Sequence, residues 1–252
     1  MTARIPKELD ATVDTVLAYR PSKEQPETEG RPWPVPDAWS VSSEQIFSDD
    51  GLRLDAAHFD PGASLDFNYD STALSEWAEV RFIRDRGQKV FSAEPVSGTK
   101  PYLNATEFQA ILSFAKEPER FISKVSDVDF DAFLIQAGWL LVTRSGTLGR
   151  VFYVTKRFSG WFASDDLIRV IPNRAETAGY LYAWLSTPAA QKQILREGYG
   201  GQIDHIDDTH LRKVRVPCLD DDVVERISTK VVRSMKLRDA ALRRIGSAWD
   251  DR

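Results

Sequence analysis

The sequence predicts an α+β fold, in which a mixed, largely antiparallel, twisted sheet is flanked by helices and followed by a long C-terminal helix. Two β-favouring runs, 139–142 and 151–155, are joined by a glycine-containing turn, which is the pattern of a β-hairpin. A pair of helices is indicated after the hairpin, because Pro188 suits the first turn of a helix and Gly198 suits its end. An apolar stripe with a period of about 3.6 residues then runs from Val224 towards the C-terminus.

The composition bounds the class of protein. With 252 residues, of which 42% are hydrophobic and 11% aromatic, the chain can bury the core of one large domain with appended helices, which excludes global disorder. It has no run of about 18 apolar residues and no apolar N-terminal stretch of the signal-peptide kind. Cys218 is the only cysteine, which excludes an internal disulfide and a cysteine-based metal cluster. We therefore expect a cytoplasmic protein without a membrane segment and without a metal.

Residues 1–38 are expected to form an N-terminal helix and a proline-rich linker. One helical stripe is formed by Leu9, Val13, Val16 and Leu17. Pro21 ends it, because a proline pushes the preceding residue out of the α region. Five prolines among charged residues then indicate an irregular arm. This helix could dock on its own chain or on a partner, and the sequence favours neither.

The central domain is expected at 39–218. A short helix that runs into a strand is indicated at 74–83. A basic cluster surrounds Phe82 and consists of Arg81, Arg84, Arg86 and Lys89. From Tyr102 the chain is expected to be extended and then to turn, because Asn104 and Thr106 readily bond their own backbone.

The hairpin is the most motif-like stretch of the chain. Leu140, Leu141 and Val142 are expected to be buried in its first strand, and a positive φ is cheap at Gly146 and Gly149 in its turn. The polar groups of the tip could form a presented surface or could merely solvate the turn. The rest of the domain is predicted as strands at 161–164 and 166–172, helices at 175–185 and 189–196, a loop at 198–206 and a strand at 211–217.

The last element is a long helix at 219–252. Asp220, Asp221 and Asp222 place negative charge at its N-terminus, where the helix dipole favours it. Its apolar stripe consists of Val224, Ile227, Val231, Met235, Leu242 and Ile245. This face is larger than a small domain usually covers, so we expect the helix to pair with another helix. The alternative is that it folds back on its own domain or on the N-terminal helix.

The charge is unevenly distributed. The net charge of −5 argues at first against a nucleic-acid partner. Residues 1–80, however, hold 6 Lys/Arg against 16 Asp/Glu, whereas residues 141–216, which include the hairpin tip, hold 11 against 7. A local basic face is the feature that phosphate contact requires, although charge also fluctuates along chains that bind no nucleic acid.

No residue pattern indicates catalysis. His205 and His210, with Asp204, Asp207 and Asp208 nearby, do not have the spacing of metal ligands or of a catalytic base and its partner. The glycines of the 198–206 loop lack the Lys-Ser/Thr pair that follows a phosphate-binding loop.

Several segments resemble the specificity subunits of type I restriction-modification systems. Gly138–Arg150, GWLLVTRSGTLGR, resembles the family's GDLLxTRSGTLGR segment, with Trp139 where an acidic residue is usual. Five others resemble family segments in the family's order: Leu52–Pro61 (RLDAxYYxP), Tyr102–Phe108 (PYIRxxDI), Ala163–Val170 (ASxHLIRV), Gly198–Ile206 (xxGSxxxHI) and Leu211–Pro217 (LxxIxVPLP).

The resemblance implies a half-length member with a single target-recognition domain at 39–218, which is not an enzyme and reads double-stranded DNA. In such a protein, Arg and Lys contacts to phosphate set the register, and polar side chains at loop tips read base edges in the major groove. The candidate DNA-contacting residues are Lys100, Asn104, Thr106, Arg144, Ser145, Thr147, Lys156 and Gln202. Asn104 and Thr106 could equally be plain turn residues.

The resemblance also implies partners. Methylation would belong to an adenine-DNA methyltransferase subunit that binds S-adenosylmethionine, since this chain lacks the Asn/Asp-Pro-Pro-aromatic motif of such enzymes and is expected to bind no cofactor itself. A nuclease could belong to the same system. The C-terminal helix would act as a spacer, dock the methyltransferase, and pair with a second copy or with another specificity subunit. The alternative function is a protein-binding adaptor of a phage-defence complex that keeps the fold without reading DNA.

Overall fold

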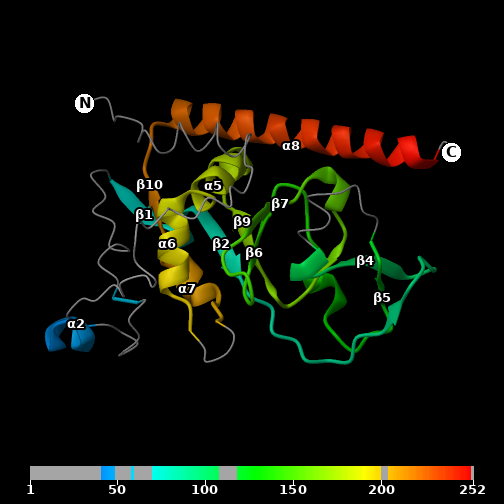
Figure 1. Cartoon of the computed structure of the whole chain (residues 1–252), viewed down its shortest axis with the longest axis horizontal. Helices are drawn as coiled ribbons and strands as arrows, with labels where there is room; N and C mark the ends of the chain where they lie inside the picture. The colour runs from blue at the N-terminus through cyan, green and yellow to red at the C-terminus, as the bar shows by residue number, and fades with distance from the viewer. Residues whose placement is uncertain (1–40, 49–57, 60–69, 108–117, 200–203, 251–252) are drawn as a thin grey trace, which may run out of the picture.

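The computed structural model describes residues 41–48, 58–59, 70–107, 118–199 and 204–250 (Figure 1). The helices are α2 (Ser43–Ser48), α3 (Leu74–Trp77), α5 (Ala178–Leu185), α6 (Pro188–Arg196), α7 (Asp208–Arg212) and α8 (Asp221–Asp250), with 3-10 turns η2 (Phe130–Phe133), η3 (Lys156–Phe158) and η4 (Ala175–Thr177). The strands are β1 (Ser71–Ala73), β2 (Ala78–Arg81), β3 (Phe91–Ser92), β4 (Thr99–Leu103), β5 (Phe121–Ser123), β6 (Leu140–Thr143), β7 (Val151–Tyr153), β8 (Phe162–Ala163), β9 (Leu167–Pro172) and β10 (Arg215–Pro217). The helix and linker predicted at 1–38 lie outside the described residues, as does most of Leu52–Pro61.

The described strands form three sheets. The large sheet has the order β2–β9–β6–β7 and is antiparallel throughout. The small sheet has the order β3–β5–β4–β8, in which β4 and β8 run parallel. Strands β1 and β10 form an antiparallel pair. The predicted α+β fold with mixed, largely antiparallel pairing is therefore confirmed, although the strands are divided among three sheets.

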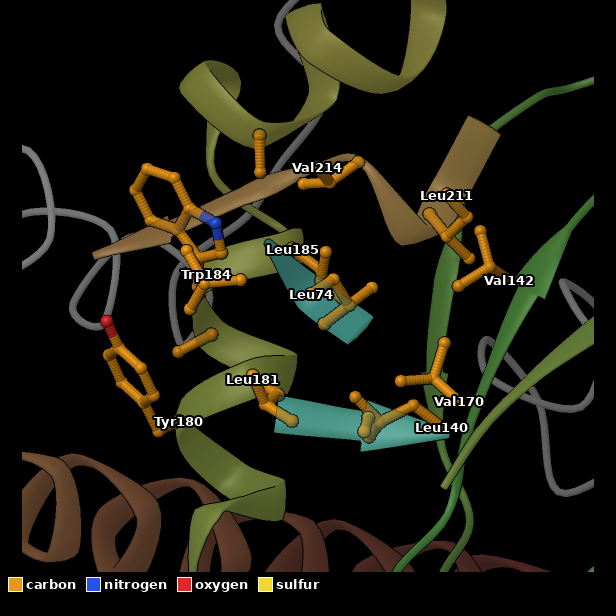
Figure 2. Close-up of a cluster of buried hydrophobic side chains, with 14 of the residues drawn as sticks. Leu74, Leu140, Val142, Val170, Tyr180, Leu181, Trp184, Leu185, Leu211 and Val214 are labelled. Carbon is orange, nitrogen blue, oxygen red and sulfur yellow. The ribbon is translucent and has the colours of Figure 1, made fainter. Parts of the chain in front are cut away.

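Strand β6 is buried on both faces and so connects two parts of the core. On one face, Leu140 and Val142 lie with Val170 of β9 in the cluster that α5 contributes to through Leu181 (Figure 2). On the other face, Leu141 belongs to a second cluster, formed with β7 and the start of β9. Because successive side chains of a strand alternate between faces, a strand covered on both sides has the continuous apolar sequence found here.

Helix α5 lies between the large sheet and α8, and its contact with α8 is close. A Cβ atom added to Gly179 would lie 2.5 Å from the carbonyl oxygen of Ser228, so only glycine allows this approach of the two backbones. The Ser228 hydroxyl accepts a hydrogen bond of 3.0 Å from the buried amide of Tyr180. Helix α8 then continues along the length of the molecule beyond α5 (Figure 1).

This packing divides the stripe that was predicted for oligomerisation. Its first four residues, which lie in the main core with α5 of the same chain, are Val224, Ile227, Val231 and Met235. Leu242 is also buried, whereas Ile245 is 53% exposed, and Leu237, outside the stripe, is 62% exposed. The first half of α8 therefore folds back on its own domain, which was the alternative expectation, and pairing with another helix stays a prediction.

Two sequence expectations differ from the structure. The strand predicted at 211–217 begins only at Arg215, because the preceding residues form α7. Asp207 starts that helix with a capping box: its carboxylate accepts the amides of Thr209 and His210, and the His210 ring accepts the Asp207 amide. The strand predicted at 161–164 is shorter, since β8 covers only Phe162–Ala163, and it pairs in parallel with β4. No helix among the described residues has the length and apolarity needed to cross a bilayer.

Candidate nucleic-acid interface

The topology of the large sheet brings three loops to one of its ends. Thr143, the last residue of β6, pairs with Leu167, the first residue of β9. Arg81, the last residue of β2, pairs with Arg169, near the same end of β9. Because both neighbours of β9 are antiparallel to it, the segments that follow β2 and β6 meet the segment that precedes β9. We call this set of residues (82–89, 144–149 and 164–166) the loop edge.

The hairpin tip at the loop edge has a fixed shape. Gly146 and Gly149 adopt positive φ angles of 70° and 75°, as the turn requires. The hydroxyl of Thr143 donates to the carbonyl oxygen of Thr147 and accepts the amide of Arg150 at 3.0 Å, which ties the two strands together across the turn. Gly146 and Thr147 are exposed, so the tip presents polar groups to solvent on a rigid turn.

The turn before β9 connects the hairpin tip to its neighbours. The Ser145 hydroxyl lies 3.0 Å from a carboxylate oxygen of Asp166, whose carbonyl oxygen accepts the amide of Arg144 at 2.9 Å. The Lys89 ammonium lies 3.1 Å from the carboxylate of Asp165. The amide of Ser164 donates to β4 at Leu103, at 2.8 Å. This one turn therefore contacts the hairpin tip, the segment after β2 and the end of β4.

Arg169 supports this turn from within the core. Its side chain is fully buried, and its guanidinium donates hydrogen bonds to the carbonyl oxygens of Ala163, Ser164 and Leu167. Burial lowers the pKa of Arg169 to about 10, and the charge of Asp165 opposes that shift, so the guanidinium is charged at neutral pH. A single buried guanidinium thus binds three carbonyl oxygens, one in the turn and one on each of the two strand ends that flank it.

Two arginines of the loop edge share one aromatic ring. The Cζ atom of Arg144 lies 4.6 Å from the ring centre of Phe82, and the Cζ atom of Arg84 lies 5.5 Å from it. Phe82 packs against the main core and is half-buried. No carboxylate within the described ranges forms an ion pair with Arg84 or Arg144. Two positive groups therefore lie at one aromatic ring, and no described acidic residue neutralises either of them.

The loop before α7 also reaches the hairpin tip. The amide of Ile206 donates to the carbonyl oxygen of Arg144 at 3.0 Å, and Ser145 forms a bridge with His205. Tyr199 pairs with the same histidine and is 38% exposed. Sequence reasoning did not single out Tyr199 as a site residue, because an isolated tyrosine after a helix carries no local signal.

The predicted DNA-contacting residues fall into two groups. Arg144, Ser145 and Thr147 lie together at the loop edge. Asn104 follows the end of β4 near the same turn, but its side-chain oxygen accepts the amides of Thr106 and Glu107, at 2.9 and 2.8 Å. The turn role expected for Asn104 is therefore present, whereas the Thr106 side chain is exposed.

Other candidates are not gathered at this place. Lys100 lies on β4 opposite Ile122 of β5, within the small sheet. Lys156 follows β7, whose last residue pairs with the first residue of β6, so it lies at the opposite end of the hairpin from the tip. Gln202 lies outside the described residues. Contact of any of these residues with DNA stays a prediction.

Trp139, the departure from the family segment, lies at the base of the hairpin. It is partly buried and packs against the second core cluster, which includes Leu141 and Phe152. The tip lies at the other end of β6. The tryptophan that stands in place of the family's acidic residue therefore packs at the base of the hairpin and does not belong to the loop edge.

Comparison with known proteins identifies a family and several similar structures. Residues 71–219 match the family model of the type I restriction modification DNA specificity domain, and no curated protein matches the chain. The HsdS subunit from Thermoanaerobacter tengcongensis is 16% identical with a TM-score of 0.46, and the match covers 73% of this chain and 41% of that one. The type I restriction-modification S subunit from M. genitalium is 14% identical with a TM-score of 0.43, covering 73% and 43%.

A chain from a structure of the type I R-M system, described for its complex assembly and conformational transition, is 14% identical with a TM-score of 0.47, covering 76% and 44%. This protein thus spans less than half the length of each of these three solved chains. The family model, by contrast, covers more than half of the 252 residues and contains the hairpin, the loop edge and the helix pair. The protein therefore belongs to the family of type I restriction-modification DNA specificity domains.

Proposed function

We propose that this protein is a sequence-specific DNA-recognition subunit, which reads duplex DNA with its loop edge and directs a partner adenine-DNA methyltransferase to the site. The observation that carries the proposal is the convergence of three loops at one sheet end. Two arginines that form no ion pair with a described residue lie there beside polar groups of the hairpin tip. The chemistry of methyl transfer belongs to the partner, which binds S-adenosylmethionine, and a nuclease subunit can act at the same site.

The loop edge offers both kinds of contact that a DNA reader needs. Guanidinium groups bind phosphates and set the register, whereas side-chain hydroxyls meet base edges in the major groove. A carboxylate oxygen accepts hydrogen bonds, so the Ser145 hydroxyl is the donor in its hydrogen bond to Asp166. The lone pairs of the Ser145 oxygen then remain to accept a hydrogen bond from a base. The donors that bases present in the major groove are the amino groups of adenine and cytosine, so these are the groups that Ser145 would contact.

The test of this function is a footprint. The full chain, mixed with its proposed methyltransferase partner, is expected to protect one short sequence in a library of duplexes, with an affinity that falls steeply with salt as counterions are released. Sequence-independent protection, or none at all, contradicts the reader function. A complex that forms with the methyltransferase but leaves DNA unprotected supports the adaptor function instead.

Assembly with a second subunit is proposed to use the second half of α8. Among the side chains that the structure describes there, the large exposed apolar ones are Leu237 and Ile245, whereas the stripe residues of the first half lie in the main core with α5. Leu237→Asp is expected to lower the mass measured by light scattering while the melting temperature stays unchanged. Val231→Asp, its control on the buried side, is expected to lower the melting temperature, because it places a charge in the core. An unchanged mass for Leu237→Asp excludes this surface from assembly.

A further inference from the structure

We propose that Phe82, Arg84 and Arg144 form a phosphate clamp, in which one aromatic ring holds two guanidinium groups that together bind a phosphodiester group of the duplex, whatever its base sequence. The clamp rests on the proposed DNA-reading function. It adds the ligand group, a phosphodiester, and the residue that supports the two arginines, Phe82. It also adds Arg84, which the sequence alone did not single out as a DNA contact.

The first argument is the proximity of two like charges. The Cζ atoms of Arg144 and Arg84 lie 4.6 and 5.5 Å from the same ring centre, so they are within about 10 Å of each other, comparable to the screening length of about 8 Å at physiological salt. Each cation is attracted to the ring, but the two repel one another. An anion bound by both groups removes that repulsion.

The second argument is the contrast with neighbouring cations. Arg81 pairs with Glu79 at 2.7 Å, and Lys89 pairs with Asp165 at 3.1 Å. Among the described residues, Arg84 and Arg144 form no such ion pair, although Arg84 lies between Arg81 and Lys89 in the sequence. The Nε atom of Arg144 is moreover buried and makes no hydrogen bond to a described group. Within the described ranges, no carboxylate therefore competes with a ligand for these two guanidinium groups.

The third argument is that the platform is fixed. Phe82 packs against the main core. The main chain of Arg144 is held on both sides, since its amide donates to Asp166 at 2.9 Å and its carbonyl accepts from Ile206 at 3.0 Å. A cation that is already oriented loses less conformational entropy on binding than one at the end of a free side chain. Arginine also presents a planar fork of donors that matches two phosphate oxygens at once.

The chemistry selects a phosphodiester of duplex DNA as the ligand. A duplex carries one negative charge per about 1.7 Å of its axis, so a phosphate is available wherever the hairpin tip enters a groove. A clamp of this kind positions the protein without reading sequence, because every nucleotide carries the same phosphate. Sequence is then read by the hydroxyl groups beside it, Ser145 and Thr147.

The clamp is tested with the full chain and two fluorescent duplexes of about 30 base pairs, one with the footprinted site and one without it, titrated at several salt concentrations. Arg84→Ala and Arg144→Ala are each expected to weaken binding to both duplexes about tenfold, because a charge-assisted hydrogen bond is lost, and to reduce the salt slope by about 1. Phe82→Leu keeps both charges and much of the apolar contact but removes the ring, and about a threefold loss is expected from the released arginines.

Arg86→Ala is the matched control, since Arg86 is exposed, lies two residues from Arg84 and makes none of these ring contacts. Its effect is expected to stay below about twofold, as for a solvated cation. If Arg84→Ala behaves like Arg86→Ala while the wild-type chain binds, the clamp is wrong and the proposed function stands. If the wild-type chain binds neither duplex, alone or with the methyltransferase, the proposed function fails and the clamp fails with it. Circular dichroism of each variant separates lost contacts from lost folding.

Discussion

The two ends of the β6–β7 hairpin are stabilised by different interactions. At the base, Trp139 packs against the second core cluster, where the rings of Phe152 and Phe158, and of Phe158 and Trp161, meet edge to face with centres 5.0 Å apart. At the tip, the aromatic ring of Phe82 is covered by guanidinium groups instead. The base is stabilised by burial, whereas the tip leaves charge and hydrogen-bonding capacity exposed.

This difference teaches how one sequence motif can serve two purposes. The apolar half of the motif lies in β6, which is buried on both faces and anchors the hairpin in the domain. The polar half lies in the turn, whose shape is set by two glycines and by the hydroxyl of Thr143. Substitutions at the base should therefore change the free energy of unfolding, and substitutions at the tip should change DNA binding.

The largest effect is expected at the base. Phe158→Ala removes a ring that is 1% exposed, and the lost burial and the remaining cavity should lower the free energy of unfolding by about 3–5 kcal/mol. Urea denaturation measures this change. The folded fraction of the variant should keep the affinity of the wild-type chain for the footprinted duplex. If Phe158→Ala lowers the affinity for DNA but leaves the free energy of unfolding unchanged, the base does not act on stability alone and the proposed difference between base and tip is wrong.

The next effect concerns Arg169, which links the two regions. Arg169→Met keeps an unbranched apolar stem but removes the guanidinium donors from the carbonyl oxygens of Ala163, Ser164 and Leu167, of which Ser164 keeps only the amide of Leu167 at 3.3 Å. A loss on the order of 3 kcal/mol is expected. Because this turn holds Ser145 through Asp166, the preference for the footprinted duplex should also fall. Arg169→Lys, which keeps the charge and part of the bonding, should recover some of both. A variant that loses stability but keeps its full sequence preference shows that Arg169 is structural only.

Much of the fold could be predicted from local patterns. The hairpin, the helix after Pro188 and the long C-terminal helix follow from periodicity and turn residues that act over a few positions. Helix α7 was missed because its cap, Asp207 with His210 three residues later, is not the Ser/Thr and Glu/Gln combination that usually marks a capping box. The parallel pairing of β4 with β8 joins residues about sixty positions apart, and no local pattern contains that information.

The candidate site was predicted in part, for the same reason. Arg144, Ser145 and Thr147 are adjacent in sequence, so they could be proposed together. Arg84 reaches Arg144 only because β2 and β6 flank β9, which is a property of the sheet order. The burial of Arg169 was equally hidden, since an arginine in an otherwise apolar strand is expected to face solvent.

A smaller effect is expected at the tip, on selectivity alone. Ser145→Ala removes the proposed acceptor and should reduce the preference for the footprinted duplex about tenfold, the lower part of the range for a specific base contact. Asp166→Asn is the sharper variant, because an amide can donate to the Ser145 oxygen and free its proton to bind an acceptor on a base. The variant is expected to prefer a different base at one position in a library selection. Unchanged selectivity in both variants removes Ser145 from the set of base contacts.

The smallest effect is expected where the hairpin tip meets the start of α7. Asp207→Ala removes the cap of that short helix and should lower the free energy of unfolding by about 1 kcal/mol. Burial alone would raise the pKa of Asp207, but hydrogen bonds from the Thr209 side chain and from the amides of His210 and Thr209 outweigh it, so the pKa lies below its usual value. The stabilisation is therefore present above the unfolded pKa of 3.8 and is lost as the pH falls through the folded pKa.

Urea denaturation as a function of pH should thus show that wild type and Asp207→Ala differ near pH 7 and converge in acid. Asp204→Ala provides the control, since Asp204 is exposed and takes no part in the capping box. A constant difference at all pH values contradicts the assignment of the cap to the ionised carboxylate. Because the loop before α7 contacts Arg144 through Ile206, a fall in DNA affinity for Asp207→Ala alone would show that the tip depends on this support from outside the sheet.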